Sequence, residues 1–246
     1  MFSIFKKKHS DKIDLSALRT DMHSHLMPGI DDGSPDPKVS IELIKGLTDL
    51  GYSRFVTTPH ILWGMYNNDN NTIHAAHQEL QQELQSSSYN CNIQPAAEYF
   101  LDEHFDELLE RKEKLLTIKD NMVLVEFSFI ALSPNFKKQI FQLQINGYQP
   151  ILAHPERYLY LSKTKDVFDE LKSAGCLFQI NLLSLAGYYG KPSLDLANYL
   201  IKKGLVDLVG TDLHHFRHLD ALRRSTSMMN TVSQLLDSGK LLNPSL

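Results

Sequence analysis

Histidines and carboxylates recur along this 246-residue chain where short apolar runs end. His23 and His25 are two residues apart in Asp-Met-His-Ser-His, so on a β-strand both side chains leave the same face and can bind one cation. Such a pair is weak evidence by itself, because two surface histidines around a serine are common. Its weight depends on further candidate ligands elsewhere in the chain.

Seven more residues with metal-binding side chains follow in separate segments. They are Asp32 in Pro-Gly-Ile-Asp-Asp-Gly, His60 in Thr-Thr-Pro-His, Glu98 in Ala-Ala-Glu-Tyr, Glu126 in Leu-Val-Glu-Phe-Ser, His154 in Leu-Ala-His-Pro-Glu-Arg, and Asp212 and His214 in Gly-Thr-Asp-Leu-His. With the first pair they make five imidazoles and four carboxylates. One ion takes about four to six ligands, so this set predicts two or three divalent cations. Manganese or iron suits these donors, and ligand type alone leaves zinc open.

Glu126 is the most informative member of the set. A carboxylate within Val-Leu-Val-Glu-Phe needs a strong partner to stay ionised in an apolar strand. A metal ion would supply that partner, and a salt bridge to arginine or lysine is the alternative. Asp32 lies in a turn sequence that favours aspartate in any case, and Asp31 remains an alternative ligand.

The charge of the ligand set indicates what the site would bind. Four carboxylates alone would repel a phosphate dianion. Three divalent cations would change the charge of the set from about −4 to about +2. The sequence therefore predicts that the metals create an anion site.

The elements that must position these residues alternate between β-rich runs and helical segments, which predicts a parallel sheet of the α/β class. The expected strands are 19–25, 54–60, 93–98, 122–128, 150–154, 177–182 and 206–212. The expected helices are 37–50, about 72–85, 134–146, 165–174 and 194–203. The carboxyl ends of strands in a parallel barrel share one rim, so the candidate ligands should meet there.

Length and composition limit the remaining classes. A single α/β barrel routinely occupies about 250 residues. The 25 basic and 29 acidic residues give a net charge of −4, and the longest basic run is Lys6 to Lys8, so nucleic acid is not an expected partner. No apolar stretch is long enough to span a bilayer. We expect a cytoplasmic protein, because the chain has only two cysteines and its start does not resemble a secretory signal.

Other routes to phosphate-ester or acyl chemistry lack their residues. A cysteine phosphatase needs an arginine six positions after its cysteine, and the residues six positions after Cys91 and Cys176 are Ala97 and Leu182. Both cysteines are interpreted as small buried hydrophobes. Neither a phosphate-binding glycine-rich loop nor a nucleophile elbow occurs.

The ordered motifs, from Asp-Met-His-Ser-His to Thr-Asp-Leu-His, resemble those of the PHP (polymerase and histidinol phosphatase) phosphoesterases over residues 20–214. The combination is most similar to the branch of protein-tyrosine phosphatases in capsule and exopolysaccharide production. The resemblance implies a distorted seven-stranded (β/α)7 TIM-like barrel and a centre of three metal ions, usually manganese, bound by the nine residues. It also implies a phosphotyrosine protein as partner, namely a bacterial tyrosine kinase with a tyrosine-rich tail.

The resemblance also implies roles for two arginines. Arg157, three residues after His154, matches an arginine of the branch and would hold the phosphoryl oxygens bidentately; the alternative is an ion pair with Glu156 or another acid. Arg217 would be a second phosphate clamp, although its spacing differs from the family pattern. We expect a hydroxide made available by the cations to attack phosphorus in line, and no residue is assigned as the general acid.

Residues 1–18 are expected to form a flexible tail, in which residues 1–8 touch a membrane surface weakly at most, and residues 19–246 a single PHP domain. Loop 63–71 is either a peptide-recognition loop or an ordinary mobile one. Two other functions remain open: a small-molecule phosphomonoesterase such as a histidinol-phosphate phosphatase, and a regulatory protein that binds the kinase without catalysis.

Overall fold

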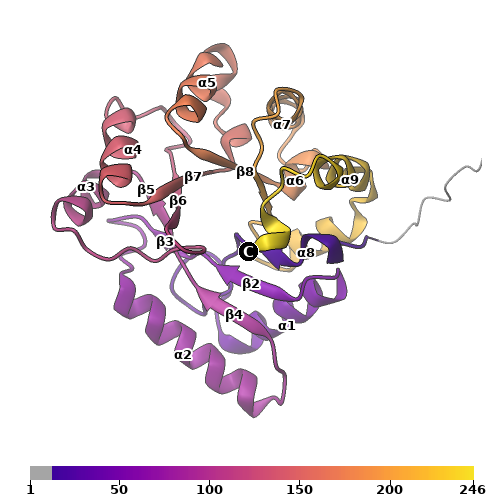
Figure 1. Cartoon of the computed structure of the whole chain (residues 1–246). Coiled ribbons are helices and arrows are strands. Elements are labelled where there is room, and N and C mark those ends of the chain that lie inside the picture. The colour runs from indigo at the N-terminus through magenta and orange to yellow at the C-terminus, as the bar shows by residue number, and fades with distance from the viewer. Residues whose placement is uncertain (1–12) are drawn as a thin grey trace, which may run out of the picture.

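Parallel β-strands occupy the centre of the molecule, which is a computed structural model that describes residues 13–246 (Figure 1). Within these residues the strands are β1 Thr20–Asp21, β2 Arg54–Thr57, β3 His60–Ile61, β4 Asn92–Pro95, β5 Glu98–Phe100, β6 Met122–Glu126, β7 Gln149–Ala153, β8 Leu177–Asn181 and β9 Leu208–Gly210. They pair in the orders β1-β2-β4 and β3-β5-β6-β7-β8-β9. This arrangement confirms the predicted α/β class.

The nine strands occupy seven positions around a distorted barrel. β2 continues into β3 after a break at Thr58 and Pro59, and β4 continues into β5 after two residues. Beyond β1 and β9 the chain closes the ring through a parallel bridge between Ser24 and Leu213. The His25 N–H donates to the Leu213 carbonyl oxygen at 2.9 Å in this closure. The seven expected strands correspond to these seven positions.

Helices surround the strands (Figure 1). They are α1 Pro37–Asp49, α2 Asn70–Ser86, α3 Glu103–Glu110, α4 Phe136–Ile145, α5 Asp166–Ser173, α6 Leu182–Leu185, α7 Lys191–Lys202, α8 Phe216–Arg224 and α9 Met229–Asp237. Short 3₁₀ helices occupy Ser16–Leu18, Pro155–Arg157, Leu159–Lys163, Thr226–Met228 and Asn243–Ser245. The five predicted helices are present, and α7 begins three residues before its predicted start because Pro192 suits a first turn. The sequence analysis did not predict α3, α6, α8 and α9.

Side-chain alternation along each strand divides the interior into two layers. Val123 and Val125 of β6 pack in the cluster shared with the helices, whereas Leu124 packs with barrel residues such as Ile151 and Leu208. Leu246 joins this inner cluster. Since Glu126 is two residues after Leu124, it points to the same interior one layer further along the strand. Apolar side chains therefore fill one end of the barrel, and polar side chains occupy the other.

Part of the segment that was predicted to be a tail belongs to the core. Ile13, Leu15 and Leu18 are buried in the core, and the Leu15 N–H donates to the Leu50 carbonyl oxygen at 2.7 Å. The prediction of a flexible tail over residues 1–18 is therefore wrong for residues 13–18, because their apolar side chains find a core to pack against. Residues 1–12, and with them the predicted membrane-surface contact of residues 1–8, lie outside the described residues.

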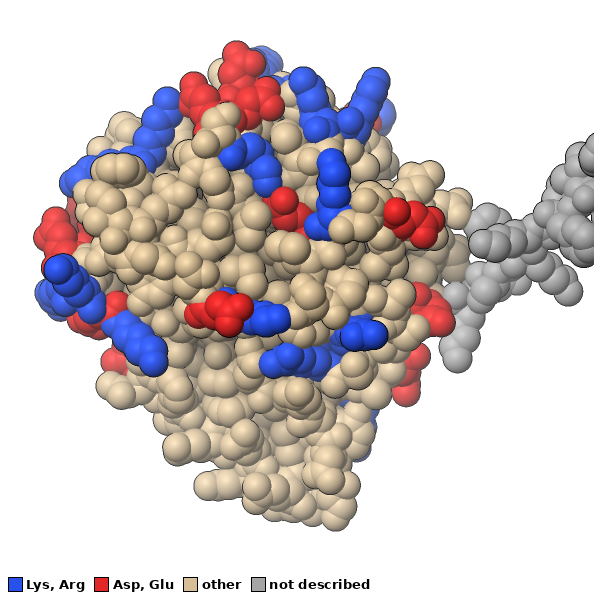
Figure 2. Space-filling view, in the orientation of Figure 1, with Lys and Arg blue, Asp and Glu red and all other residues tan. Residues whose placement is uncertain are grey.

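The surface carries both signs of charge. Figure 2 shows lysine and arginine side chains interspersed with acidic ones on the face that it presents, in keeping with a net charge of only −4. Among residues 13–246, no helix combines the length and the apolarity that a bilayer crossing requires.

Candidate metal centre

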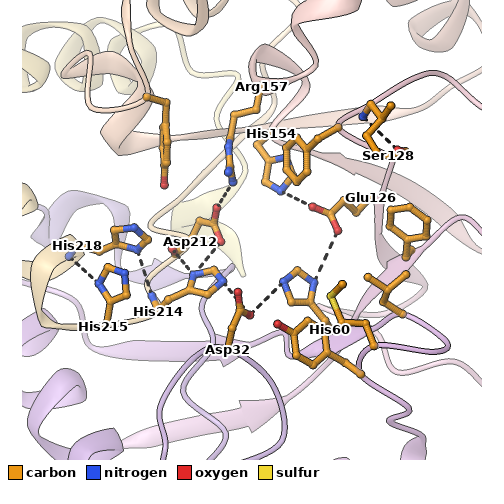
Figure 3. Close-up of a pocket in the computed structure, with 17 residues that line it drawn as sticks. Asp32, His60, Glu126, Ser128, His154, Arg157, Asp212, His214, His215 and His218 are labelled. Atoms are coloured by element: carbon orange, nitrogen blue, oxygen red, sulfur yellow. Dashed lines mark hydrogen bonds and ion pairs between the residues drawn. The ribbon is translucent and has the colours of Figure 1, made fainter.

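All nine predicted ligands meet at the polar end of the barrel. Figure 3 labels Asp32, His60, Glu126, His154, Asp212 and His214 among them. Within residues 13–246, their donor atoms form overlapping groups whose members lie within 4.8 Å of one another. The groups are His25, Asp32, His60 and His214; His23, His154 and Asp212; His23, His25 and Glu98; and His60, Glu98 and Glu126. The rim of the parallel barrel thus brings together residues that are up to 191 positions apart in the chain, from His23 to His214.

Glu98 lies at the centre of the cluster and is completely buried. Its Oε2 atom lies 3.3 Å from His23 Nε2, 3.5 Å from His25 Nε2 and 3.2 Å from His60 Nδ1. Its Oε1 atom lies 3.1 Å from His154 Nε2. One carboxylate therefore faces four imidazoles, and it belongs to two of the four donor groups.

The separations between these donor atoms fit binding to shared divalent cations better than direct hydrogen bonds between the donors. Two ligands that are each about 2.1 Å from one ion lie about 3.0–3.4 Å apart, which is the separation found around Glu98. Glu98 Oε2 and His60 Nδ1 are buried and have no hydrogen-bond partner within the described part of the chain. Leaving such atoms unpaired is costly, and a shared cation removes that cost.

Glu126 has the surroundings expected of a ligand. Its oxygens lie 3.4 Å from His154 Nε2 and 3.7 Å from His60 Nδ1, and no lysine or arginine of residues 13–246 forms an ion pair with it. Burial, followed by the charges of Glu98 and Asp212, raises the pKa of Glu126 well above its ordinary value. A positive ion at this position would reverse that effect.

The structure distinguishes the two aspartates of the Asp-Asp-Gly turn. Asp32 Oδ1 lies 3.6 Å from His60 Nε2 and 3.6 Å from His214 Nε2, so it faces the cluster. Asp31 is turned away and accepts a hydrogen bond from His25 Nδ1 at 2.8 Å. This contact leaves His25 Nε2 free to face the cluster, as carboxylates that orient metal-binding histidines do. The geometry favours Asp32 as the ligand and Asp31 as the residue that orients His25.

A chain of two amides orients two further members of the cluster, and the first of these amides, Gln179, was not predicted from the sequence. His23 Nδ1 donates to Gln179 Oε1 at 2.8 Å, and Gln179 Nε2 donates to Asn181 Oδ1 at 2.9 Å. Asn181 Nδ2 in turn donates to Asp212 Oδ2 at 2.7 Å. The available signal was the two-residue spacing of Gln179 and Asn181 in β8, which puts both side chains inside the barrel. β8 therefore contributes support in place of ligands.

Two residues at the same rim have a strained backbone. His154 has φ 31° and Asp212 has φ 51°, values in the left-handed region that residues with a Cβ rarely adopt. Each residue follows directly on a strand or its extension and turns its side chain into the cluster. Strain of this kind usually marks positions that the surrounding structure holds for function.

A cavity of about 550 Å³ opens over the cluster (Figure 3). Its lining residues are Asp32, His60, Leu62, Met65, Tyr66, Phe100, Glu126, Ser128, Phe129, Ile130, His154, Arg157, Tyr189, Asp212, His214, His215 and His218. The volume lies within the range of about 300–1,000 Å³ that is usual for small-molecule sites.

Arg157 enters the cavity above Asp212 (Figure 3). Its NH1 group donates to Asp212 Oδ2 at 2.9 Å, so it pairs with an acid of the cluster rather than with Glu156. The guanidinium carbon lies 4.6 Å from the ring centroid of Phe129 and 4.4 Å from that of Tyr189. An ion pair and two aromatic faces thus hold the guanidinium in place.

Arg217 does not share this position. It is exposed on α8 and does not line the cavity, whereas His218 does. Successive residues of a helix point about 100° apart, so one of the two faces away from the cavity when the other faces it. The expectation of a second phosphate clamp at Arg217 is therefore not met by the structure.

Loop 63–71 is anchored beside the cluster. The buried Asn68 donates through Nδ2 to the Ile30 carbonyl oxygen at 2.8 Å and to the His60 carbonyl oxygen at 2.9 Å. The Tyr66 ring stacks on His60 with centroids 5.5 Å apart, and the last residues of the loop already belong to α2. These contacts contradict an ordinary mobile loop.

Comparison with known proteins places this geometry in context. The family model "Capsular polysaccharide synthesis, CpsB/CapC" matches residues 19–236. Tyrosine-protein phosphatase YwqE of Bacillus subtilis (strain 168) is 29% identical over 198 residues, which is 80% of this chain and 78% of the relative. Tyrosine-protein phosphatase CpsB of Streptococcus pneumoniae is 27% identical over 201 residues, or 79% of this chain and 82% of the relative.

Solved structures are similar as well. A crystal structure from a study of YwqE from Bacillus subtilis and CpsB from Streptococcus pneumoniae, reported as metal-dependent tyrosine phosphatases, superposes with a TM-score of 0.78 at 26% identity. That match covers 92% of this chain and 90% of the other. Histidinol phosphate phosphatase of Lactococcus lactis superposes with a TM-score of 0.56 at 14% identity over 93% and 94% of the two chains, which shows a shared fold.

Proposed function

The chain belongs to the CpsB/CapC family of capsular polysaccharide synthesis, and we propose on that basis that it is a metal-dependent protein-tyrosine phosphatase. The observation that carries the proposal is the convergence of five histidines and four carboxylates below a cavity that also holds one arginine. A phosphoric monoester fits this combination, because cations and a guanidinium together bind its oxygens.

His23, His25, Asp32, His60, Glu98, Glu126, His154, Asp212 and His214 would hold two or three divalent ions. Manganese is the proposed metal, since oxygen and imidazole donors without thiolates suit it; iron and zinc are the alternatives. When bound, such ions polarise phosphoryl oxygens and make a hydroxide nucleophile available near neutral pH. Glu98 belongs to two donor groups, which supports a site in which neighbouring ions share ligands.

Arg157 would bind the phosphoryl group directly. A guanidinium carries five N–H donors, and one hydrogen bond to Asp212 leaves others for the equatorial oxygens of the ester. Asp212, Phe129 and Tyr189 hold the guanidinium before the substrate arrives, so little freedom is lost when the ester binds. The charge that develops in the transition state then meets a donor already in position.

The leaving group explains a preference for tyrosine. A phenol has a pKa of about 10, so its oxygen needs less protonation on departure than the alkoxide of serine would. An open site without an assigned general acid therefore suffices for an aryl ester. The apolar rings beside Arg157 also suit the ring of phosphotyrosine.

The proposed substrate is a phosphotyrosine protein of capsule or exopolysaccharide production, namely the tyrosine-rich tail of a bacterial tyrosine kinase. The resemblance of the motifs and the names of the relatives support this proposal. The proposed location is the cytoplasm, where both Cys91 and Cys176 would remain free thiols, as they are in the structure.

One assay tests the function. Metal-loaded protein is given a phosphotyrosine peptide, a phosphoserine peptide and histidinol phosphate, each with and without a chelator. We expect hydrolysis of the phosphotyrosine peptide to be fastest and to stop on chelation. Faster cleavage of histidinol phosphate would replace the proposal with a small-molecule phosphatase, and turnover that survives full removal of metal would exclude the metal-dependent mechanism.

A further inference from the structure

One side of the cavity is apolar and open to solvent. We call it the apolar wall, and it consists of Leu62, Met65, Phe100, Phe129 and Ile130. Ile130 is 90% exposed, Met65 68% and Phe129 46%, whereas Leu62 and Phe100 are partly buried. A single exposed apolar residue is ordinary, but a contiguous group beside a site marks a binding surface.

The topology makes the wall continuous. Leu62 and Met65 follow β3, Phe100 ends β5, and Phe129 and Ile130 follow β6. These three strands are neighbours in the order β3-β5-β6, so their loops lie beside one another on the rim. His214, His215 and His218 line a different side of the cavity, away from Ser128, which precedes the wall residues Phe129 and Ile130 (Figure 3).

The charges around the cavity do not favour an acidic partner. Arg157 is the only lysine or arginine among the lining residues of the described chain, and it already pairs with Asp212. Acidic side chains next to the reacting residue would therefore meet the apolar surface, with no free lysine or arginine of the lining to pair with.

We propose that the apolar wall binds large apolar side chains directly beside the phosphotyrosine of the substrate, so that the enzyme selects apolar rather than acidic sequence around its target. This inference rests on the proposed function and adds the chemistry of the substrate segment to it. A peptide whose phosphotyrosine enters the cavity must cross the rim, and the neighbouring residues gain contact with Ile130 and Met65 where these are now exposed to water.

The test compares three phosphotyrosine peptides that differ only in the residue on each side of phosphotyrosine. Both of these residues are isoleucine in the first peptide, serine in the second and glutamate in the third. p-Nitrophenyl phosphate serves as a substrate without flanking residues. For the wild-type chain we expect KM to be about tenfold lower for the isoleucine peptide than for the glutamate peptide, the size expected for burying one large apolar side chain. The kcat values should differ much less.

Two double variants separate the wall from general surface effects. Met65→Ser/Ile130→Ser should abolish the preference, so that the three peptides have similar KM values, because uniform binding contacts act on KM. Phe141→Ser/Ile145→Ser is the matched control: these side chains are 59% and 62% exposed on α4 and do not line the cavity. The control should retain the wild-type preference.

A third variant adds a gain of function that a folding defect cannot mimic. Ile130→Lys should lower KM for the glutamate peptide and raise it for the isoleucine peptide. Equal KM values for the three peptides in the wild type, or a preference that survives in Met65→Ser/Ile130→Ser, would overturn the inference while the phosphatase function stands. Failure to hydrolyse every peptide and p-nitrophenyl phosphate would overturn both.

Discussion

At the scale of single residues, the cluster contains more acceptors than its own protons can satisfy. Glu98 Oε2 faces three imidazole nitrogens at 3.2–3.5 Å without a hydrogen bond. His23 and His25 already donate through Nδ1, to Gln179 and Asp31, so both present a lone pair at Nε2. Cations stabilise lone pairs that face one another in a buried space, so the arrangement around Glu98 favours bound metal ions.

The first prediction concerns Arg157. Arg157→Ala should lower kcat for a phosphotyrosine peptide about a hundredfold, the loss typical when one donor to a developing charge is removed. Metal content, measured by inductively coupled plasma mass spectrometry, should stay unchanged because the guanidinium is not a metal donor. Arg217→Ala is the control and should retain turnover within about twofold. A large loss in the control would restore Arg217 as a phosphate clamp, and an unaffected Arg157→Ala variant would remove Arg157 from the site.

The second prediction concerns Glu156, a fully buried carboxyl that accepts hydrogen bonds from the Asn181 N–H at 2.9 Å and the Ser184 hydroxyl at 2.6 Å. Burial raises the pKa of Glu156 to about 7. The pKa of Glu156 in the folded chain thus lies above its value in the unfolded chain. Its contribution to the free energy of unfolding is therefore fully present below about pH 4.5 and is lost as the pH rises through 7. The loss is on the order of 3 kcal/mol.

Glu156→Gln should therefore make stability less dependent on pH. Urea unfolding of metal-free protein from pH 5 to 8 measures the free energy of unfolding. As the pH rises, this free energy should fall less in the variant than in the wild type. Glu79→Gln, at an exposed position on α2, is the control and should track the wild type throughout. A constant difference between Glu156→Gln and the wild type would show that Glu156 titrates alike in the folded and unfolded chain.

At the scale of elements, close backbone approach fixes the loop that carries Asp31 and Asp32. A Cβ atom at Gly33 would lie 2.2 Å from the His25 carbonyl oxygen and 2.4 Å from His25 Cβ. Side chains cannot occupy such a position without moving the loop or the strand extension. The glycine of the Asp-Asp-Gly turn thus allows the close approach to His25 that places Asp31 against His25 and Asp32 facing the cluster.

The third prediction follows from this contact. Gly33→Ala should weaken metal binding by about tenfold or more, as changes behind metal ligands typically do, and should lower Tm. Gly64→Ala is the matched control, because a Cβ there meets nothing within 4 Å and adds only the strain of φ +88°, about 1 kcal/mol. Isothermal titration with Mn²⁺ measures the affinities. Equal affinities in the two variants would show that the loop adapts freely.

Part of the fold could be predicted from the sequence, and part could not. The strand positions and five helices were predictable, because their apolar periodicity and closing glycines are local signals. The break between β2 and β3 and the helices α3 and α8 were not, since Pro59 and the polar composition of α8 obscure the period. Arg217 was misplaced for the same reason: without the start of α8, its direction relative to His218 cannot be determined. Gln179 was missed because its two-residue spacing from Asn181 does not distinguish a supporting amide from an ordinary one until its partner His23 is known.

At the scale of the whole molecule, the candidate ligands join six of the seven barrel positions. His23 follows β1, Asp212 follows β9, and Glu98 and Glu126 lie on β5 and β6 between them. Ions bound here would cross the closure between the first and last strands, in addition to the bridge between Ser24 and Leu213 and the hydrogen bonds from Thr211 to Asp21. Binding energy at the site should therefore stabilise the entire barrel.

The fourth prediction tests this coupling. Removing the metal with a chelator should lower Tm by about 5–10 °C relative to protein in a solution whose free metal concentration is about a hundred times the Kd. For a chain of this size, the shift corresponds to about 2.7 kcal/mol in the free energy of unfolding. Differential scanning calorimetry makes the measurement. His23→Asn/Glu98→Gln should show little response to the chelator. A wild-type Tm that does not depend on metal would mean that the ions, if bound, lie outside the barrel.

The most direct measurement of the central claim is anomalous X-ray diffraction from crystals of the chain grown with Mn²⁺ and inorganic phosphate. We expect two or three anomalous peaks among His23, Glu98, Asp212 and the other six candidate ligands, with phosphate between the ions and Arg157. Protein that is active with Mn²⁺ but shows no peak among these nine residues, or a peak elsewhere in the molecule, would contradict this claim.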